Sequence, residues 1–252
     1  MAEIGVQISS VRDYLQDADG VLESFRKVSQ MGYRHIQIQW VNPDVSDDVI
    51  YRALRENGLH SLGTQDFYDV VLSSWERTVQ QSKMWNSDYI CVSGIPERFR
   101  SFNGCLKLAR ELTDRAEELA IIGKKLLFHP RSEDFQTYDG ELSLDILLNN
   151  TPDDVQICLD AYQFVKAGHS VADWLYRLDG RMDILHAKDY AEDSDGEHYL
   201  VPAGQGLQDW NSIIEACNET NVLYVLTEQE TWRKEPFESL KEGYQFLYRK
   251  VF

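Results

Sequence analysis

The chain has 252 residues, of which 42 are acidic and 25 are basic, and its formal net charge is −17. A surface this acidic repels phosphate groups, so the charge argues against nucleic acid or an anionic membrane as a partner. Hydrophobic residues make up 43% of the chain, enough for a proper core, and no apolar run approaches the roughly 18 residues of a membrane-spanning helix.

Eight short apolar runs recur along the chain and predict β-strands. They cover residues 4–9, 35–39, 60–64, 89–93, 125–129, 155–160, 182–186 and 222–228. Helical segments lie between them, two of which carry one-sided apolar stripes. The stripes are Cys105, Ala109, Leu112, Ala116 and Leu119, and Phe237, Leu240, Tyr244 and Leu247.

Strand and helix alternating eight times over about 250 residues predicts a (β/α)8 TIM barrel, formed as one domain by residues 1–252. A doubly wound open sheet is the alternative. That fold would need a glycine-rich phosphate loop after its first strand, and the chain reads QISSVRD there.

Four neighbouring strands end in ionisable residues, in the segments LLFH, ICLD, DILH and VLTE. These residues are His129, Asp160, His186 and Glu228. In a TIM barrel such positions meet at the catalytic face. Isolated charges there would be costly to desolvate, whereas a divalent cation would neutralise the carboxylates and use the imidazole nitrogens as ligands. The pattern predicts one ion, Mn²⁺, Mg²⁺, Co²⁺ or Zn²⁺, held by all four residues. Taken singly, each residue would read as a rim histidine or a helix cap.

Other polar and aromatic residues near the strand ends are candidates for contact with a small sugar or sugar derivative. They are Gln7, Gln37, Trp40, Gln65, Arg131 and Tyr162. Lys188 lies two residues beyond His186 and is a candidate catalytic residue. Its alternative interpretation is a rim lysine paired with Asp189 or Glu230.

The remaining features concern the compartment and the oligomeric state. The four cysteines are far apart and form no C-x-x-C motif, so we expect buried thiols in a reducing compartment. The start MAEIGVQISS lacks the pattern of a signal peptide, and we therefore expect a cytoplasmic protein. Aromatic residues expected in exposed loops would allow a homodimer; they are Trp75, Trp85, Phe99 and Phe102.

Five segments in order resemble the sugar phosphate isomerase/epimerase family, with its xylose-isomerase-like TIM barrel. GVQISSVRD resembles the first strand and loop, and SLDILLNNTPDDVQICLDAYQFVKAGH the sixth-strand block. ILHAKD resembles the H-x-K-D of strand 7, VPAGQGLQDW a P-x-G-x-G-x-x-D-W segment, and LTEQE with EPFESLKEGYQFL the closing strand and helix.

The resemblance implies a divalent metal at the ends of strands 5 to 8, with Asp160, His186 and Glu228 matching the ligands. The strand-5 ligand is usually a Glu that doubles as a base, and His129 stands there instead. Three more departures put Gln at positions where the family commonly has Glu or His: Gln37, Gln65 and Gln205. An amide keeps the hydrogen bonds but cannot exchange protons.

The family activity implied is proton transfer next to a carbonyl through an enediolate. Glu228 would be the carboxylate base, His129 the acid or base on the opposite side, and Lys188 a contact for the developing oxyanion or for a phosphate. The alternatives are a keto-sugar or inosose dehydratase or lyase, and a non-catalytic sugar-binding relative. The DNA-repair endonucleases of this fold would need more histidines and a basic groove.

Overall fold

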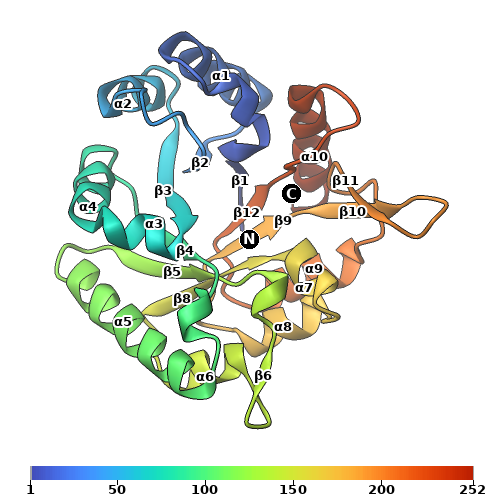
Figure 1. The fold of residues 1–252 in the computed structure, drawn as a ribbon. Coiled ribbons are helices and arrows are strands. Elements are labelled where there is room, and N and C mark those ends of the chain that lie inside the picture. The colour runs from blue at the N-terminus through green and yellow to red at the C-terminus, as the bar shows by residue number, and fades with distance from the viewer. Residues whose placement is uncertain (1, 252) are drawn as a thin grey trace.

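Eight parallel strands close into a barrel around which the helices are arranged (Figure 1). The computed structural model describes residues 2–251, so the first and last residues of the predicted domain lie outside the described residues. The strands follow one another around the barrel in the order β1-β12-β9-β8-β5-β4-β3-β2. Their bounds are β1 Glu3–Gln7, β2 His35–Ile38, β3 His60–Phe67, β4 Tyr89–Ser93, β5 Lys125–His129, β8 Val155–Asp160, β9 Ile184–Ala187 and β12 Tyr224–Thr227.

The predicted TIM barrel is confirmed, and each predicted strand corresponds to one strand of the barrel. The bounds of five strands, β1, β2, β3, β9 and β12, differ from the prediction, and β1 and β3 show why. The first ends at Gln7, where the chain turns into a 3₁₀ helix, η1 (Ile8–Tyr14). The third continues to Phe67 because it stays paired with β4 as far as Ser93.

Ten α-helices cover the barrel and its ends among the described residues (Figure 1). They are α1 Ala18–Met31, α2 Asp47–Glu56, α3 Tyr68–Ser73, α4 Trp75–Met84, α5 Phe102–Ala120, α6 Ser143–Asn149, α7 Ala161–Lys166, α8 Val171–Arg177, α9 Trp210–Glu219 and α10 Pro236–Val251. Short 3₁₀ helices form η2 (Glu97–Phe99) and η3 (Ser132–Asp134). Two hairpins project from the strand ends: β6 (Thr137–Tyr138) with β7 (Glu141–Leu142), and β10 (Asp189–Glu192) with β11 (His198–Val201).

The barrel interior is apolar below the strand ends and polar above them. Side chains on a strand alternate between the inside and the helix layer, so each strand sends every second residue inward. A cluster of buried residues from β3, β4, β5, β8, β9 and β12 fills the interior: Leu62, Tyr89, Cys91, Leu127, Cys158, Ile184 and Leu226. This layer closes the barrel beneath the site.

The aromatic residues expected at the surface are packed into the protein, and that prediction is wrong for two of them. Trp85 and Phe99 are each only 5% exposed and belong to the core, and Trp75 and Phe102 pack against it half-buried. The Trp85 indole also donates a hydrogen bond to the carbonyl oxygen of Asp47. The proposed homodimer therefore loses the observation on which it rested.

The cysteines are buried and free, as predicted. Within residues 2–251, no helix has the length and apolar character needed to cross a bilayer.

Candidate functional site

A pocket of about 250 Å³ opens at the carboxyl ends of the barrel strands. Twelve residues from seven of the eight βα connections or strand ends line it. They are Gln39, Trp40, Gln65, Phe67, Ser93, His129, Arg131, Asp160, Gln163, Lys188, Glu228 and Glu230. The strand-end rule of TIM barrels thus brings the predicted ionisable residues to one place.

Asp160 is the last residue of β8 and also the N-cap of α7. Its Oδ1 accepts hydrogen bonds from the backbone N–H groups of Tyr162 and Gln163, at 2.8 and 3.1 Å. Oδ2 is then left to the pocket, 2.7 Å from the Lys188 ammonium and 3.7 Å from Nε2 of His129. Burial opposes ionisation of this carboxyl, but Lys188 and the neighbouring imidazoles outweigh it and hold its pKa well below its usual value.

His129 ends β5 beside the hydroxyl of Ser93, which ends β4. The Ser93 hydroxyl donates to the backbone carbonyl of His129 and lies 3.0 Å from Nδ1 of its ring. Because that proton is already used, the hydroxyl accepts from Nδ1–H, and the lone pair of the ring is on Nε2. Nε2 is buried and has no hydrogen-bond partner among the described residues.

His186 is completely buried and is oriented by an amide from the other side of the barrel. Its Nε2 lies 2.6 Å from Oε1 of Gln37, which also accepts from Gln7, so Nε2–H is the donor. Nδ1 then lies 2.9 Å from Oε2 of Glu228. Burial disfavours a charged ring, but the contacts with Cys158 and Glu228 raise the pKa of His186 well above its ordinary value. A proton or a metal ion is therefore required between Nδ1 and the Glu228 carboxylate.

Lys188 lies inside the site rather than on its rim. Its side chain is 2% exposed, and its ammonium is 2.7 Å from Asp160, 3.1 Å from Glu228 and 3.2 Å from Glu230. Burial would lower the pKa of this ammonium, and the three carboxylates raise it well above its ordinary value. The same ammonium and His186 lower the pKa of Glu228 to about 2 against the effect of burial. The predicted pairing with Glu230 is present, and Asp189 has other partners.

Asp189 is a structural anchor at the start of β10. It is fully buried and accepts hydrogen bonds from donors that follow the β10–β11 hairpin: the N–H groups of Gly204, Gly206 and Gln208 and the Trp210 indole, at 2.8 to 3.2 Å. A side chain at Gly206 would come within 2.3 Å of the Asp189 carboxylate, so only glycine fits. The GQGLQDW segment is thereby fixed against the end of strand β9.

The structure separates the candidate substrate contacts into two groups. Trp40, Gln65 and Arg131 line the pocket, and the Arg131 guanidinium lies 5.0 Å from the Phe67 ring. Gln7, Gln37 and Tyr162 do not line it. The first two are buried beneath His186, and the Tyr162 ring packs against Tyr190 and His198. Gln37 therefore orients a histidine.

Five lining residues were absent from the predicted site: Gln39, Phe67, Ser93, Gln163 and Glu230. Ser93 closes the apolar run YICVS, so the strand-end rule that selected its neighbours also identifies it. The strand-end rule could not identify Phe67, because β3 extends beyond the apolar run from which its end was predicted.

The donor set fits a divalent cation. Ligand atoms of His129, Asp160 and His186 lie within 4.8 Å of one another, and Glu228 Oε2 is 2.9 Å from His186. Donor atoms bound to one ion at about 2.1 Å have separations of this order. His129 Nε2 is buried without a hydrogen-bond partner among the described residues, as expected of an atom that binds a cation.

The protein is a closed parallel barrel that carries a buried cluster of His and carboxylate groups at the carboxyl ends of its strands. The model of the xylose isomerase-like TIM barrel family matches residues 25–250, and the chain belongs to this family. No curated protein sequence matches the chain.

Solved structures share the fold at low sequence identity. A sugar phosphate isomerase/epimerase from Parabacteroides distasonis superposes with a TM-score of 0.81 at 16% identity, over 99% of this chain and 94% of that one. The IOLI protein, solved with a zinc atom, gives 0.76 at 15% identity, over 99% and 98%. The probable 3-DHS dehydratase AsbF from Bacillus anthracis gives 0.71 at 15% identity, over 98% and 99%.

Proposed function

We propose that the chain is a metal-dependent isomerase or epimerase of a sugar or sugar phosphate that moves a proton next to a carbonyl through an enediolate. The observation that carries this proposal is the convergence of imidazole and carboxylate ligand atoms at the strand ends beside the pocket. Ligand atoms of His129, Asp160 and His186 lie within 4.8 Å of one another there. Glu228 Oε2 is 2.9 Å from His186 Nδ1, and His129 Nε2 has no hydrogen-bond partner among the described residues.

Those four residues would hold the divalent ion. A bound ion supplies Lewis acidity, which stabilises the negative charge that develops on substrate oxygens when the proton leaves carbon. The fold-family neighbour with a zinc atom supports the choice of a transition metal, although it shares the fold alone.

Proton transfer falls to Glu228 and His129. Lys188 and His186 outweigh burial and lower the pKa of Glu228, so its side chain is a carboxylate, and we assign it the proton that leaves carbon. His129 carries its lone pair on the buried Nε2 and is the second acid or base. In the barrel β12 and β5 are separated by β9 and β8, so the two groups approach a substrate from different directions. That arrangement suits exchange on both faces of a planar enediolate.

Lys188 supports this chemistry by keeping the carboxylates charged. Its three N–H donors face Asp160, Glu228 and Glu230, of which Glu230 gives the longest contact. Contact between Lys188 and a substrate oxyanion would replace the Glu230 contact. Gln65 and Trp40 would bind the hydroxyl groups and the C–H face of the sugar.

One observation favours the second candidate, a keto-sugar or inosose dehydratase or lyase. Gln39 and Gln65 line the β2 and β3 side of the pocket with amides, which cannot exchange protons. Loss of a β-leaving group from the same enediolate needs only one good base. The AsbF neighbour shows that a protein described as a probable dehydratase uses this fold.

The experiment is to incubate the metal-loaded protein with ketoses, their phosphates and 3-keto sugars in D₂O and to follow them by NMR. Deuterium incorporation without elimination supports the isomerase or epimerase, and release of a leaving group supports the lyase. Neither reaction, together with retained sugar binding, would identify a non-catalytic sugar-binding protein.

Glu228→Gln is the decisive variant. We expect turnover to fall by about 10²- to 10⁴-fold, the usual contribution of a positioned acid or base, while sugar binding changes much less. Glu230→Gln is the matched control because its carboxylate contacts Lys188 from the edge of the site and should cost far less. Equal turnover in both variants would contradict the role of Glu228.

A further inference from the structure

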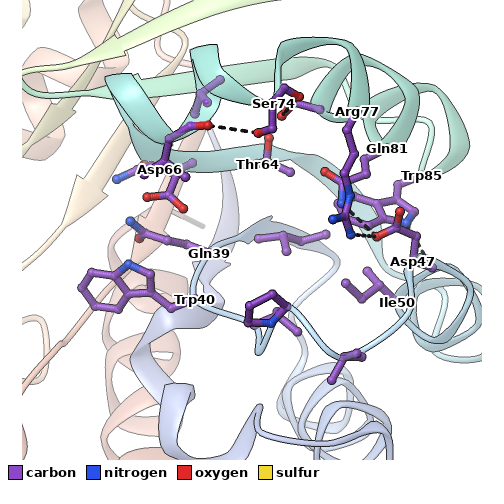
Figure 2. A pocket seen from close by; sticks show the side chains of 18 of the residues that line it. Gln39, Trp40, Asp47, Ile50, Thr64, Asp66, Ser74, Arg77, Gln81 and Trp85 are labelled. Carbon is purple, nitrogen blue, oxygen red and sulfur yellow. Dashed lines mark hydrogen bonds and ion pairs between the residues drawn. The ribbon is translucent and has the colours of Figure 1, made fainter.

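A second hollow of about 220 Å³ adjoins the pocket on the side of β2 and β3. It lies between the loop that leads into α2, the end of β3, and helices α3 and α4 (Figure 2). Gln39, Trp40 and Gln65 line both spaces, so the two hollows share a wall. Figure 2 shows Gln39 and Trp40 at one end of the second hollow and Ile50 and Trp85 at the other.

The alternation of side chains along β3 explains why this strand lines both hollows. Gln65 points into the barrel mouth, whereas its neighbours Thr64 and Asp66 face the helix layer and line only the second hollow. Gln39 and Gln65 are 8% and 5% exposed, and each has a buried Oε1 without a hydrogen-bond partner. The buried hydroxyl of Thr64 also lacks a partner. An unsatisfied buried oxygen costs about 1–3 kcal/mol, so this wall favours an occupant that brings hydrogen-bond donors.

The charges in the second hollow disfavour an anionic occupant. Arg77 is the single basic residue among the described residues that line it, and its guanidinium is 3.5 Å from the Asp47 carboxylate. Gln81 also donates to Asp47. Asp66 adds a second carboxylate, with a pKa raised by burial. Phosphate would find no free cation here, whereas neutral hydroxyl groups would find acceptors.

Ile38, Ile50 and Trp85 add apolar surface to the lining of the second hollow. Alternating hydroxyl and C–H surfaces are the chemistry of a sugar ring, whose hydroxyls need acceptors and whose C–H groups need apolar contacts. Such a mixture of apolar walls and a few polar groups is characteristic of small-molecule sites.

Trp40 divides the two hollows and has a strained backbone. Its φ of +58° is uncommon for a bulky residue, and such strain concentrates at ligand sites. The Arg12 guanidinium lies 5.2 Å from the Trp40 ring and 5.0 Å from that of Trp232, which holds the indole in place. These contacts fix the position of the Trp40 side chain in the wall that the two hollows share.

We propose that the second hollow is a subsite for a neutral second sugar ring, so that the substrate is a disaccharide or another glycoside. The proposal rests on the proposed function, because it places the reacting ring in the 250 Å³ pocket beside the ionisable cluster. The unpaired hydroxyl of Thr64 bonds to the ring that does not react, and the unpaired oxygens of Gln39 and Gln65 lie on the wall that the two rings share.

The test measures binding of a panel of disaccharides of different linkage and stereochemistry to the metal-loaded protein by titration calorimetry, each beside its own monosaccharides. We expect at least one disaccharide to bind roughly tenfold more tightly than its better monosaccharide, a difference that corresponds to about 1.4 kcal/mol. Ser74→Phe places a large ring in the second hollow and should abolish this gain while monosaccharide binding stays unchanged.

Ser73→Phe is the matched control for the blocking variant. Ser73 and Ser74 both donate their hydroxyl to the carbonyl of Val70, but Ser73 is exposed and does not line the hollow. A second variant, Thr64→Val, keeps the shape and removes an unpaired hydroxyl. It should leave stability unchanged or raise it and still weaken the disaccharide several-fold.

The possible failures are distinct. Monosaccharides that bind without any disaccharide gain, or a gain that survives Ser74→Phe, would overturn the subsite and leave the proposed function standing. If neither class of sugar binds, the subsite and the proposed function both fail.

Discussion

The two ends of the barrel use the same kinds of residue for different purposes. At the amino end, Lys125 and the Tyr89 hydroxyl both bind the Asp183 carboxylate, and His60 pairs with Asp88. The Lys125 side chain there is 47% exposed, so water shares the charge. At the carboxyl end the corresponding groups are almost completely buried, and several of their atoms have no partner.

This difference in burial and pairing distinguishes ionisable residues that stabilise the barrel from those that are available to bind a ligand. Groups at the amino end are paired with one another and remain partly hydrated, which is sufficient for stability. Groups at the carboxyl end carry desolvation costs that the chain itself does not fully offset. That deficit is the energy available for binding a cation and a substrate.

The largest expected effect compares one lysine from each end. Lys188→Met should lower the free energy of unfolding of the metal-free protein by about 3 kcal/mol, because it leaves buried carboxylates without their counter-ion. Lys125→Met should cost at most about 1 kcal/mol, since its ion pair is solvent-screened. Urea denaturation after chelation measures both. Similar losses for the two variants would remove the distinction between the ends.

Metal binding should depend on the histidine of one end only. A divalent ion at a hundredfold excess over its Kd should stabilise the wild-type protein by about 2.7 kcal/mol, seen as a rise in Tm. His186→Ala should lose this stabilisation, and His60→Ala, at the amino end, should keep it. His129→Ala then decides between a ligand, if stabilisation is lost, and an acid or base, if it is kept. Stabilisation of His186→Ala equal to wild type would refute the metal site.

A smaller effect is expected from the amide that orients His186. Gln37→Leu removes the acceptor for Nε2–H and should weaken metal binding by about 10- to 100-fold, as loss of such a supporting contact usually does. Gln65→Leu is the control, because Gln65 lines the pocket but bonds to none of the four candidate ligands. Calorimetric metal titration separates the two, and unchanged affinity in Gln37→Leu would argue that Gln37 serves the substrate after all.

The smallest effect concerns pH at the amino end. The hydrogen bond to Asp88 raises the pKa of His60 above its ordinary value of 6.5, against partial burial. A raised pKa in the folded state means stability that is fully present below about pH 6.5 and is lost as pH rises through the folded-state pKa. His60→Gln should flatten this part of the stability profile, by less than about 1 kcal/mol. A profile unchanged by the substitution would show that the pair contributes nothing.

The sequence was sufficient to predict the fold because each strand and helix has its own local period. The runs LLFH, ICLD, DILH and VLTE also predicted that His129, Asp160, His186 and Glu228 would meet, since topology alone places parallel strand ends together. What the sequence did not predict is which atom each side chain presents. The splitting of Asp160 between a helix cap and Lys188 depends on a three-dimensional turn, not on residue order.

Other errors have a common physical cause: composition does not determine burial. Trp85 and Phe99 were expected in exposed loops, but both belong to the hydrophobic core, and Trp85 also donates a hydrogen bond to the first residue of α2. Gln37 lies opposite Gly63 in the pairing of β2 with β3, two residues before Gln65, so it sits deeper in the barrel beside His186 while Gln65 faces the pocket.

The Asp189 anchor has a consequence for how the chain tolerates insertions. Its carboxylate binds both the start of β10 and the segment after β11, so the hairpin between them is tied off at its base. The hairpin projects away from the barrel, and residues 192–198 are exposed (Figure 1). We therefore expect that a tag or a short domain inserted at this tip would leave the pocket undisturbed, which makes it the natural position for a probe or a surface tether.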